Sequence, residues 1–220
     1  MYKFFNHLDR MVEFASTKQN PTILEFGVQR ALSTNKFISF AEKNNASVLS
    51  VDIEDYSNVS KSSKWKFLKS NDLDIENVIS NFPEIKETGL DLIFIDSNHE
   101  DFHVKELLLK YFKYVKKDGA IFIDDIDNYP LRLKKDTRNS IVYDLTLDAI
   151  KEFYYSNMNL CSLKIFLDNQ ENGLAMIHKK GNFEIEANPI KQVWNYNGFI
   201  KIIYPFLKKI KMILRNFFKK

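Results

Sequence analysis

Five acidic residues stand at, near or just after the end of a short apolar run: Glu25, Asp52, Asp96, Asp124 and Asp125. A single acid after a strand is commonly a helix cap or a turn residue. When parallel strands lie side by side, however, their carboxyl ends meet at one rim, and open α/β sheets bind their ligands there. The pattern therefore indicates a polar site at one edge of a sheet.

Asp96 and Asp124 end two apolar runs that are separated by one helical stretch. These runs are expected to be neighbouring parallel strands joined by a right-handed crossover. Such strands lie ~4.8 Å apart, so both carboxylates would reach one cation at the rim. Oxygen ligands suit Mg²⁺, Mn²⁺ or Ca²⁺ rather than zinc. The alternative is that a lysine or solvent relieves the repulsion between the acids.

His99 follows Asp96 by three residues, in the turn before a predicted helix. An isolated histidine is often a cap or a surface residue. Over this rim it is also a candidate general base. His103 lies one helical turn further on and is expected to be structural or to face the substrate, whereas His7 and His178 carry no functional signal.

The turn at residues 25–34 contains only one glycine, Gly27, so it lacks the G-x-G-x-x-G pattern of dinucleotide-binding loops. This argues against a pyrophosphate ligand such as NAD. Asp52 ends the second apolar run, where a carboxylate can accept both hydroxyls of a ribose. The pair Asn71 and Asp72 follows the third run, where it would either meet an adenine edge or cap a helix.

Apolar runs alternate with helical patterns through residue 125. The predicted strands cover residues 22–28, 47–51, 65–68, 90–96 and 120–123, with helices at 74–81 and 101–116 among the intervening segments. Strands that are apolar throughout are typical of a parallel sheet covered on both faces. A helix at 140–155 and two strands, 162–167 and 173–179, complete the pattern as an appended hairpin.

The predicted fold is therefore an α/β, Rossmann-like, mostly parallel seven-stranded sheet with helices on both faces and a C-terminal antiparallel hairpin. We expect an N-terminal helical segment at 1–20, one domain at 21–182, and a linker with a basic amphipathic C-terminal helix at 183–220. A chain of 220 residues suits one domain with appendages.

The motifs E-F-G-V-x-x-A-x-S-T, V-D-I, D-L-I-F-I-D-S-N-H and D-G-A-I-F-I-D-D resemble those of S-adenosylmethionine-dependent O-methyltransferases, in the group of macrocin O-methyltransferases and cephalosporin-hydroxylase-like proteins. The resemblance covers about residues 20–180. It departs from the family at Ala31, where the family usually has glycine. It implies a cofactor site lined by Glu25, Gly27, Ser33, Asp52 and Asp72, and we also assign Asp96 to that site.

The resemblance further implies that three acids, here Asp96, Asp124 and Asp125, hold a divalent metal, Mg²⁺ for preference. The expected reaction transfers a methyl group from a sulfonium to a substrate hydroxyl, and the protein must align the two and accept the hydroxyl proton. His99 and Asp96 are the candidate catalytic residues. A small molecule or a sugar or glycan precursor is the expected acceptor.

The amino-acid composition limits the classes of protein and the partners that are expected. The chain is 45% hydrophobic, with six glycines and a lone cysteine, Cys161, so it is expected to be globular and without an internal disulfide. We find no secretory signal pattern and expect a cytoplasmic protein. Residues 199–220 hold seven of the 32 basic residues and no acid; the remainder therefore has 25 basic and 29 acidic residues. A nucleic-acid enzyme would carry its basic residues on the folded body, so nucleic acid is not an expected partner.

Residues 205–220 place apolar residues on one helical face and basic residues largely on the other. This is the pattern of an interfacial helix on an anionic membrane, which would put the protein at the inner face of the membrane. Packing on the body or on a second subunit of a homo-oligomer is the alternative. Two other functions stay open: a nucleotide-binding enzyme of the NAD type, and a non-catalytic membrane-associated binding module.

Overall fold

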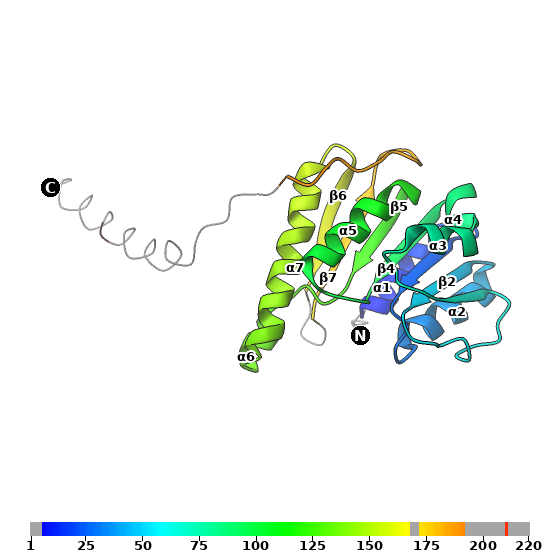
Figure 1. Cartoon of the computed structure of the whole chain (residues 1–220), viewed down its shortest axis with the longest axis horizontal. Helices are drawn as coiled ribbons and strands as arrows, with labels where there is room; N and C mark the ends of the chain where they lie inside the picture. The colour runs from blue at the N-terminus through cyan, green and yellow to red at the C-terminus, as the bar shows by residue number, and fades with distance from the viewer. Residues whose placement is uncertain (1–5, 168–171, 192–209, 211–220) are drawn as a thin grey trace, which may run out of the picture.

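The structure is a computed structural model, and residues 6–167, 172–191 and 210 are described. In these residues seven strands form one sheet in the order β3-β2-β1-β4-β5-β7-β6 (Figure 1). The strands are β1 Thr22–Phe26, β2 Ser47–Asp52, β3 Trp65–Lys69, β4 Leu90–Ile95, β5 Val115–Ile123, β6 Cys161–Phe166 and β7 Leu174–Lys179. Neighbours among β1 to β5 pair in parallel, and β7 pairs antiparallel with β5 and with β6. The predicted sheet and its C-terminal hairpin are confirmed.

Helices cover both faces of the sheet (Figure 1). They are α1 His7–Ser16, α2 Leu32–Asn44, α3 Ile75–Asn81, α4 Glu84–Glu87, α5 Asp101–Tyr111, the 3₁₀ turn η1 Phe112–Tyr114, α6 Tyr129–Leu133 and α7 Thr137–Ser156. Alternate strand residues belong to opposite cores, as the period of two requires. Ile23 packs with α1 and α2, whereas Leu24 packs with α3, α5 and α7. The strands are buried on both sides, which explains their continuous apolar runs.

The prediction of a helix at 101–116 was wrong at its C-terminal end. The helix α5 stops at Tyr111, and Val115 is already the first residue of β5, where it pairs with Leu90. Val115 continues the helical spacing of the apolar residues, and this spacing is the reason that the sequence predicted it to lie on the buried face of the helix. The pairing shifts register between Leu90 and Leu92, and this irregularity lets β5 begin earlier than the apolar run at Ala120.

The reversal of strand order positions the candidate site. β1 lies between β2 and β4, so the crossovers on its two sides lead away in opposite directions. Such a switch point leaves a crevice beyond the carboxyl ends of the strands. Gly27, Asp52 and Asp96 all lie at or just after these ends, and Asp124 follows β5 next to them.

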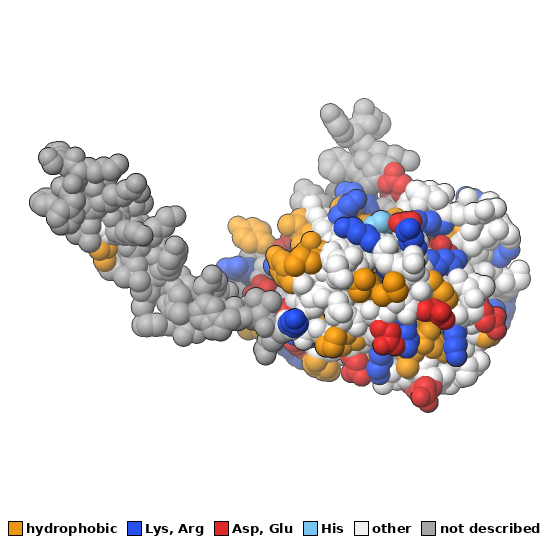
Figure 2. Space-filling model, turned by 90° about the horizontal axis from the view of Figure 1, so that it is seen from above, with side chains coloured by type: hydrophobic (Ala, Val, Ile, Leu, Met, Phe, Trp, Pro, Cys, Tyr) orange, Lys and Arg blue, Asp and Glu red, His pale blue; other side chains and the backbone are white. Residues whose placement is uncertain are grey.

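Apart from Ile210, the predicted C-terminal helix and the segment 199–220 lie outside the described residues, as does most of the turn at 168–172. In the part of the chain that is described, no helix is both long enough and apolar enough to span a bilayer. Figure 2 shows acidic and basic side chains interspersed on the face seen from above.

Candidate active site

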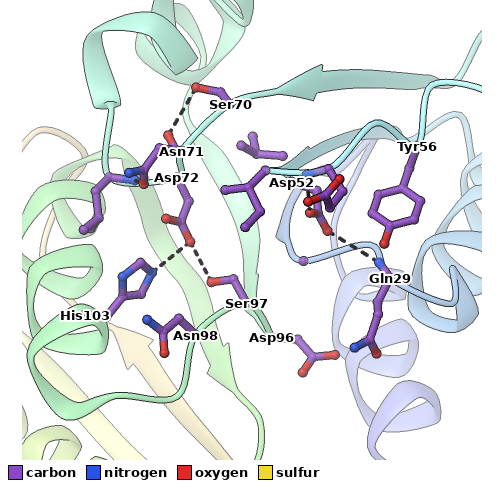
Figure 3. A pocket seen from close by; sticks show the side chains of 15 residues that line it. Gln29, Asp52, Tyr56, Ser70, Asn71, Asp72, Asp96, Ser97, Asn98 and His103 are labelled. Carbon is purple, nitrogen blue, oxygen red and sulfur yellow. Dashed lines mark hydrogen bonds and ion pairs between the residues drawn. The ribbon is translucent and has the colours of Figure 1, made fainter.

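A cavity of about 440 Å³ lies at the carboxyl ends of the central strands (Figure 3). Four of the residues assigned to the cofactor site line it: Gly27, Asp52, Asp72 and Asp96. Polar residues that the sequence analysis did not assign to this site also line it: Gln29, Tyr56, Ser97, Asn98 and His103. Ser97 and Asn98 directly follow Asp96, so their position in the chain was a usable signal.

The loop after β1 makes a close backbone approach to the end of β4. Gly27 has a φ of +94°, and a Cβ at this position would lie 2.2 Å from the carbonyl oxygen of Asp96. Only glycine fits there without displacing the backbone. Ala31 also has a left-handed backbone, with a φ of 56°, at the start of α2. This conformation explains why glycine would be favoured at Ala31.

Asp52 fastens the same loop from the end of β2. Its Oδ2 accepts a hydrogen bond from the backbone N–H of Val28 at 2.7 Å, and its Oδ1 accepts one from the N–H of Glu54 at 3.0 Å. The carboxylate is therefore held in a fixed orientation on the cavity wall. Ile53, next to it, also lines the cavity and is 68% exposed, so it offers an apolar surface to a ligand.

Asp72 lies on the opposite side of the cavity, between two donors (Figure 3). Its Oδ2 accepts hydrogen bonds from Ser97 Oγ at 2.6 Å and from His103 Nε2 at 3.0 Å. Burial by itself would raise the pKa of Asp72, but the hydrogen bonds from His103 and Ser97 bring that pKa below its ordinary value. The carboxylate is thus ionised at neutral pH.

The structure does not bring Glu25 or Ser33 to the cavity wall. The pleat of β1 turns the Glu25 side chain toward α2, where its Oε2 accepts hydrogen bonds from Thr34 and Ser50, both at 2.7 Å. The carboxyl is fully buried, and this burial raises its pKa. Glu25 therefore braces the start of α2 against β2, instead of lining the cavity as the resemblance implied.

At the rim, His99 stands between two acids that come from different strand ends. Its Nε2 lies 3.6 Å from Asp96 Oδ1 and 3.5 Å from Asp125 Oδ2. Burial, and then the charges of Asp124, Asp125 and Glu25, raise the pKa of Asp96 to about 8. The structure thus brings His99, Asp96 and Asp125 together at the rim, whereas the topology predicted that Asp96 and Asp124 would meet there.

Helix α7 fixes His99 from above the rim. Thr146 Oγ1 donates a hydrogen bond to the carbonyl oxygen of His99, and the Tyr143 ring meets the His99 ring edge-on, with centroids 5.8 Å apart. The Nδ1 atom of His99 is buried and has no hydrogen-bond partner in the described part of the chain. The neighbouring acids therefore face Nε2 alone.

Asp124 and Asp125 have partners that the sequence analysis missed. Asp124 Oδ1 lies 2.9 Å from Nδ1 of His7 on α1, a residue 117 positions away. Asp125 accepts hydrogen bonds from the Tyr143 hydroxyl and from Asn172 Nδ2. The contact between His7 and Asp124 results from the packing of α1 on the sheet. No local sequence pattern predicts a contact between residues so far apart in the chain.

The predicted metal site needs a correction as to its arrangement. In the residues that the structure describes, no group of three or more His, Cys, Asp or Glu side chains is placed so that it could hold a metal ion. Asp124 turns to His7, and Asp125 turns to Tyr143 and Asn172, so the three carboxylates do not converge. Adjacent strand ends bring acids to one rim, but side-chain partners decide where each carboxylate points.

Comparison with known proteins supports one interpretation of this site. Residues 24–126 match a family model described as a methyltransferase domain. No curated protein matches the sequence. Among solved structures, the MycE methyltransferase of the mycinamycin biosynthetic pathway, in complex with Mg, SAH and mycinamycin VI, is 17% identical, with a TM-score of 0.55 over 86% of this chain and 51% of MycE. The present chain thus spans about half the length of MycE.

Two further structures have the same fold. The cofactor-bound protein Rv0187 from MTB is 16% identical, with a TM-score of 0.61 over 79% of both chains. The O-methyltransferase TomG from Streptomyces achromogenes, in complex with SAM, is 13% identical, with a TM-score of 0.55 over 78% of both chains. Residues 24–126 therefore resemble a methyltransferase domain, and the described part of the chain has the fold of these methyltransferase structures.

Proposed function

We propose that this protein is an S-adenosylmethionine-dependent O-methyltransferase that acts on a hydroxyl group of a small molecule or of a sugar or glycan precursor. The single observation that carries the proposal is that the cavity adjoins the group of acids around His99 at the rim of the sheet. Asp96 lines the cavity, and its Oδ1 is 3.6 Å from the candidate base His99. A methyl donor in the cavity would thus lie beside a proton acceptor.

The charge of the cavity favours this cofactor over a dinucleotide. Asp52, Asp72 and Asp96 line it, and none of the described residues that line it is Lys or Arg. S-adenosylmethionine has a net positive charge, whereas NAD has a pyrophosphate that the Asp52 and Asp72 carboxylates would repel. When bound, S-adenosylmethionine supplies an electrophilic methyl group. Asp52 would hold the ribose and Asp72 the adenine edge.

His99 is the proposed general base. Its ring lies beside Asp96 and Asp125, and the negative charge of Asp125 stabilises the imidazolium that forms when the ring accepts the hydroxyl proton. Tyr143 and Thr146 hold the residue in place, so the ring is already oriented. The oxygen that loses its proton becomes the nucleophile, and the protein aligns it with the methyl donor.

We also propose that Asp96, Asp124 and Asp125 hold a divalent cation, Mg²⁺ for preference, once Asp124 turns from His7 and Asp125 turns from Tyr143 and Asn172. The donor set supplies the oxygen ligands that Mg²⁺ prefers. Burial, and then the charges of Asp124 and Asp125, raise the pKa of Asp96 to about 8, and a cation at this rim would offset that crowding of acids. When bound, such a cation lowers the pKa of a hydroxyl group. Mg is present in the MycE complex.

The basic segment 199–220 is proposed to bring the enzyme to an anionic membrane surface, where a glycan precursor would be presented. It carries seven Lys or Arg residues and no acid. Lys and Arg side chains attract anionic lipids, and apolar residues between them insert at the headgroup boundary.

Calorimetry with S-adenosylmethionine and NAD in parallel tests the cofactor. We expect heat of binding for S-adenosylmethionine alone, and transfer of its labelled methyl group to a vicinal diol in a panel of sugars and glycosides. Binding of NAD and not of S-adenosylmethionine would assign the site to a nucleotide-dependent enzyme. A chain that binds neither compound would point to a non-catalytic binding module.

A further inference from the structure

One face of α5 holds the loop that follows β3. His103 Nε2 contacts Asp72 Oδ2 at 3.0 Å, the Tyr111 hydroxyl donates to the carbonyl oxygen of Asp72 at 2.8 Å, and Lys110 Nζ donates to the carbonyl oxygen of Leu73 at 2.7 Å. These three residues are spaced by seven and eight positions, so they share one face of the helix. The loop is thereby fixed to α5 through both its backbone and a side chain.

A second element reaches the same carboxylate from the other side. Ser97, just after β4, donates to Asp72 Oδ2 at 2.6 Å (Figure 3). Two donors therefore converge on one oxygen atom. The side chains of Asp72 and His103 are only 8% and 10% exposed, so water contributes little to this arrangement. An ionised carboxylate can only accept hydrogen bonds, and His103 must therefore carry its ring proton on Nε2.

We propose that His103, together with Ser97, is a positioning residue that aims the Asp72 carboxylate at the exocyclic amino group of adenine and so makes the site selective for a 6-amino purine. The inference rests on the proposed function, because it requires the adenine of the cofactor at this wall. His103 acts through Asp72, and its contribution is the direction of the carboxylate.

The chemistry of the two purines gives this inference a sharp consequence. The 6-amino group of adenine donates a hydrogen bond to a carboxylate, whereas the 6-oxo group of hypoxanthine is an acceptor and meets the carboxylate with repulsion. With hypoxanthine the buried Asp72 carboxylate would lose the hydrogen-bond donor that adenine supplies, and this loss makes the difference between the two affinities large. The ratio of the two affinities therefore reports the direction of Asp72, while general loosening of the fold would weaken both ligands alike.

The test measures binding of S-adenosylhomocysteine and of S-inosylhomocysteine to the full-length protein by calorimetry. Wild type is expected to prefer the adenine compound by at least about tenfold. In His103→Phe, which keeps a ring without a donor, the ratio is expected to fall to within about threefold of unity. In His103→Gln, whose amide places a donor near the position of Nε2, the ratio is expected to stay within about threefold of wild type.

Two further variants keep the test decisive. Ser97→Ala removes the other donor to Oδ2 and is expected to lower the ratio, even if His103→Phe fails to fold. Tyr111→Phe removes a hydrogen bond to the backbone of the loop, so it is expected to weaken both compounds and leave their ratio unchanged. Thermal unfolding of each variant confirms that it is folded.

The outcomes separate the two hypotheses. If wild type binds neither compound, the proposed function fails and the inference fails with it. If wild type binds both compounds equally, or if folded His103→Phe and Ser97→Ala keep the wild-type ratio, the cofactor assignment stands and the role of His103 is overturned.

Discussion

At the scale of single residues, the acidic residues of this site have different roles, because their burial and their hydrogen-bond partners differ. Glu25 is fully buried among hydroxyl donors and braces α2, whereas Asp52 and Asp72 reach the cavity and Asp96 is crowded by other acids. A carboxyl group therefore serves as a structural brace at Glu25, as a proposed ligand contact at Asp52 and Asp72, and as a candidate metal ligand at Asp96. The burial of each carboxyl group and its hydrogen-bond partners determine which of these roles it has.

Asp52→Ala is expected to weaken S-adenosylmethionine binding by roughly ten- to a hundredfold, the loss of about 1.5–3 kcal/mol for hydrogen bonds to a charged group. The variant removes a carboxylate that lines the cavity and is held by the N–H groups of Val28 and Glu54. Calorimetry measures the dissociation constant. Asp55→Asn, in the same loop but outside the cavity lining, is the matched control. An unchanged constant for Asp52→Ala would place the cofactor elsewhere.

At the scale of elements, a buried lysine joins the hairpin to the end of α5. Lys179 on β7 is fully buried, and its Nζ donates to the carbonyl oxygens of Phe112 at 2.9 Å and Lys113 at 3.3 Å. These carbonyls end a helical segment, where a cation is favourable. Burial nonetheless lowers the pKa of Lys179 to about 8.

This pKa predicts stability that rises with pH. The ordinary pKa of a lysine side chain is 10.5, so between about pH 8 and pH 10.5 the unfolded chain binds more protons than the folded one. The cost of keeping Lys179 charged in the folded state, roughly 3 kcal/mol at neutral pH, is relieved over that interval. Urea unfolding of wild type relative to Lys179→Met should show wild type gaining roughly 2 kcal/mol between pH 7 and pH 10. Parallel curves for the two proteins would contradict the prediction.

The pairing of β4 with β5 also places two acids at one rim of the sheet, because Asp96 follows β4 and Asp124 follows β5. If a cation joins these strand ends, EDTA should abolish methyl transfer, and Mg²⁺ or Mn²⁺ should restore it. Added Mg²⁺ should also raise the unfolding temperature of wild type but not that of Asp124→Asn. Asp118→Asn, at the opposite end of β5, is the control. Activity that survives complete chelation, with a normal rate for Asp124→Asn, would leave His99 as the base of a metal-free site.

At the scale of the whole molecule, charge is divided between the body and the C-terminal segment. Deleting residues 199–220 changes the formal charge from +3 to −4 and removes none of the residues that line the cavity. The deletion should release the protein from vesicles that contain phosphatidylserine and leave S-adenosylmethionine affinity intact. Sedimentation with these vesicles, and with phosphatidylcholine alone as control, measures the effect. If full-length protein never sediments with them, the segment packs on the body or on a second subunit.

The sequence by itself determined the layered fold and the place of the rim. Apolar runs that alternate with helical spacing are local patterns, and a strand buried on both faces needs apolar residues throughout. The acids at the ends of β2, β4 and β5 follow directly from those runs, so their position at one rim could be predicted from topology alone.

Only the tertiary structure decided the partners of those acids. His7 meets Asp124 across 117 residues, and the pleat of β1 turns Glu25 toward α2. Val115 fits a helical spacing and a strand equally well, until pairing with Leu90 assigns it to β5. In each case the deciding contact joins segments that are distant in sequence, and local periodicity contains no information about which distant groups will pack together.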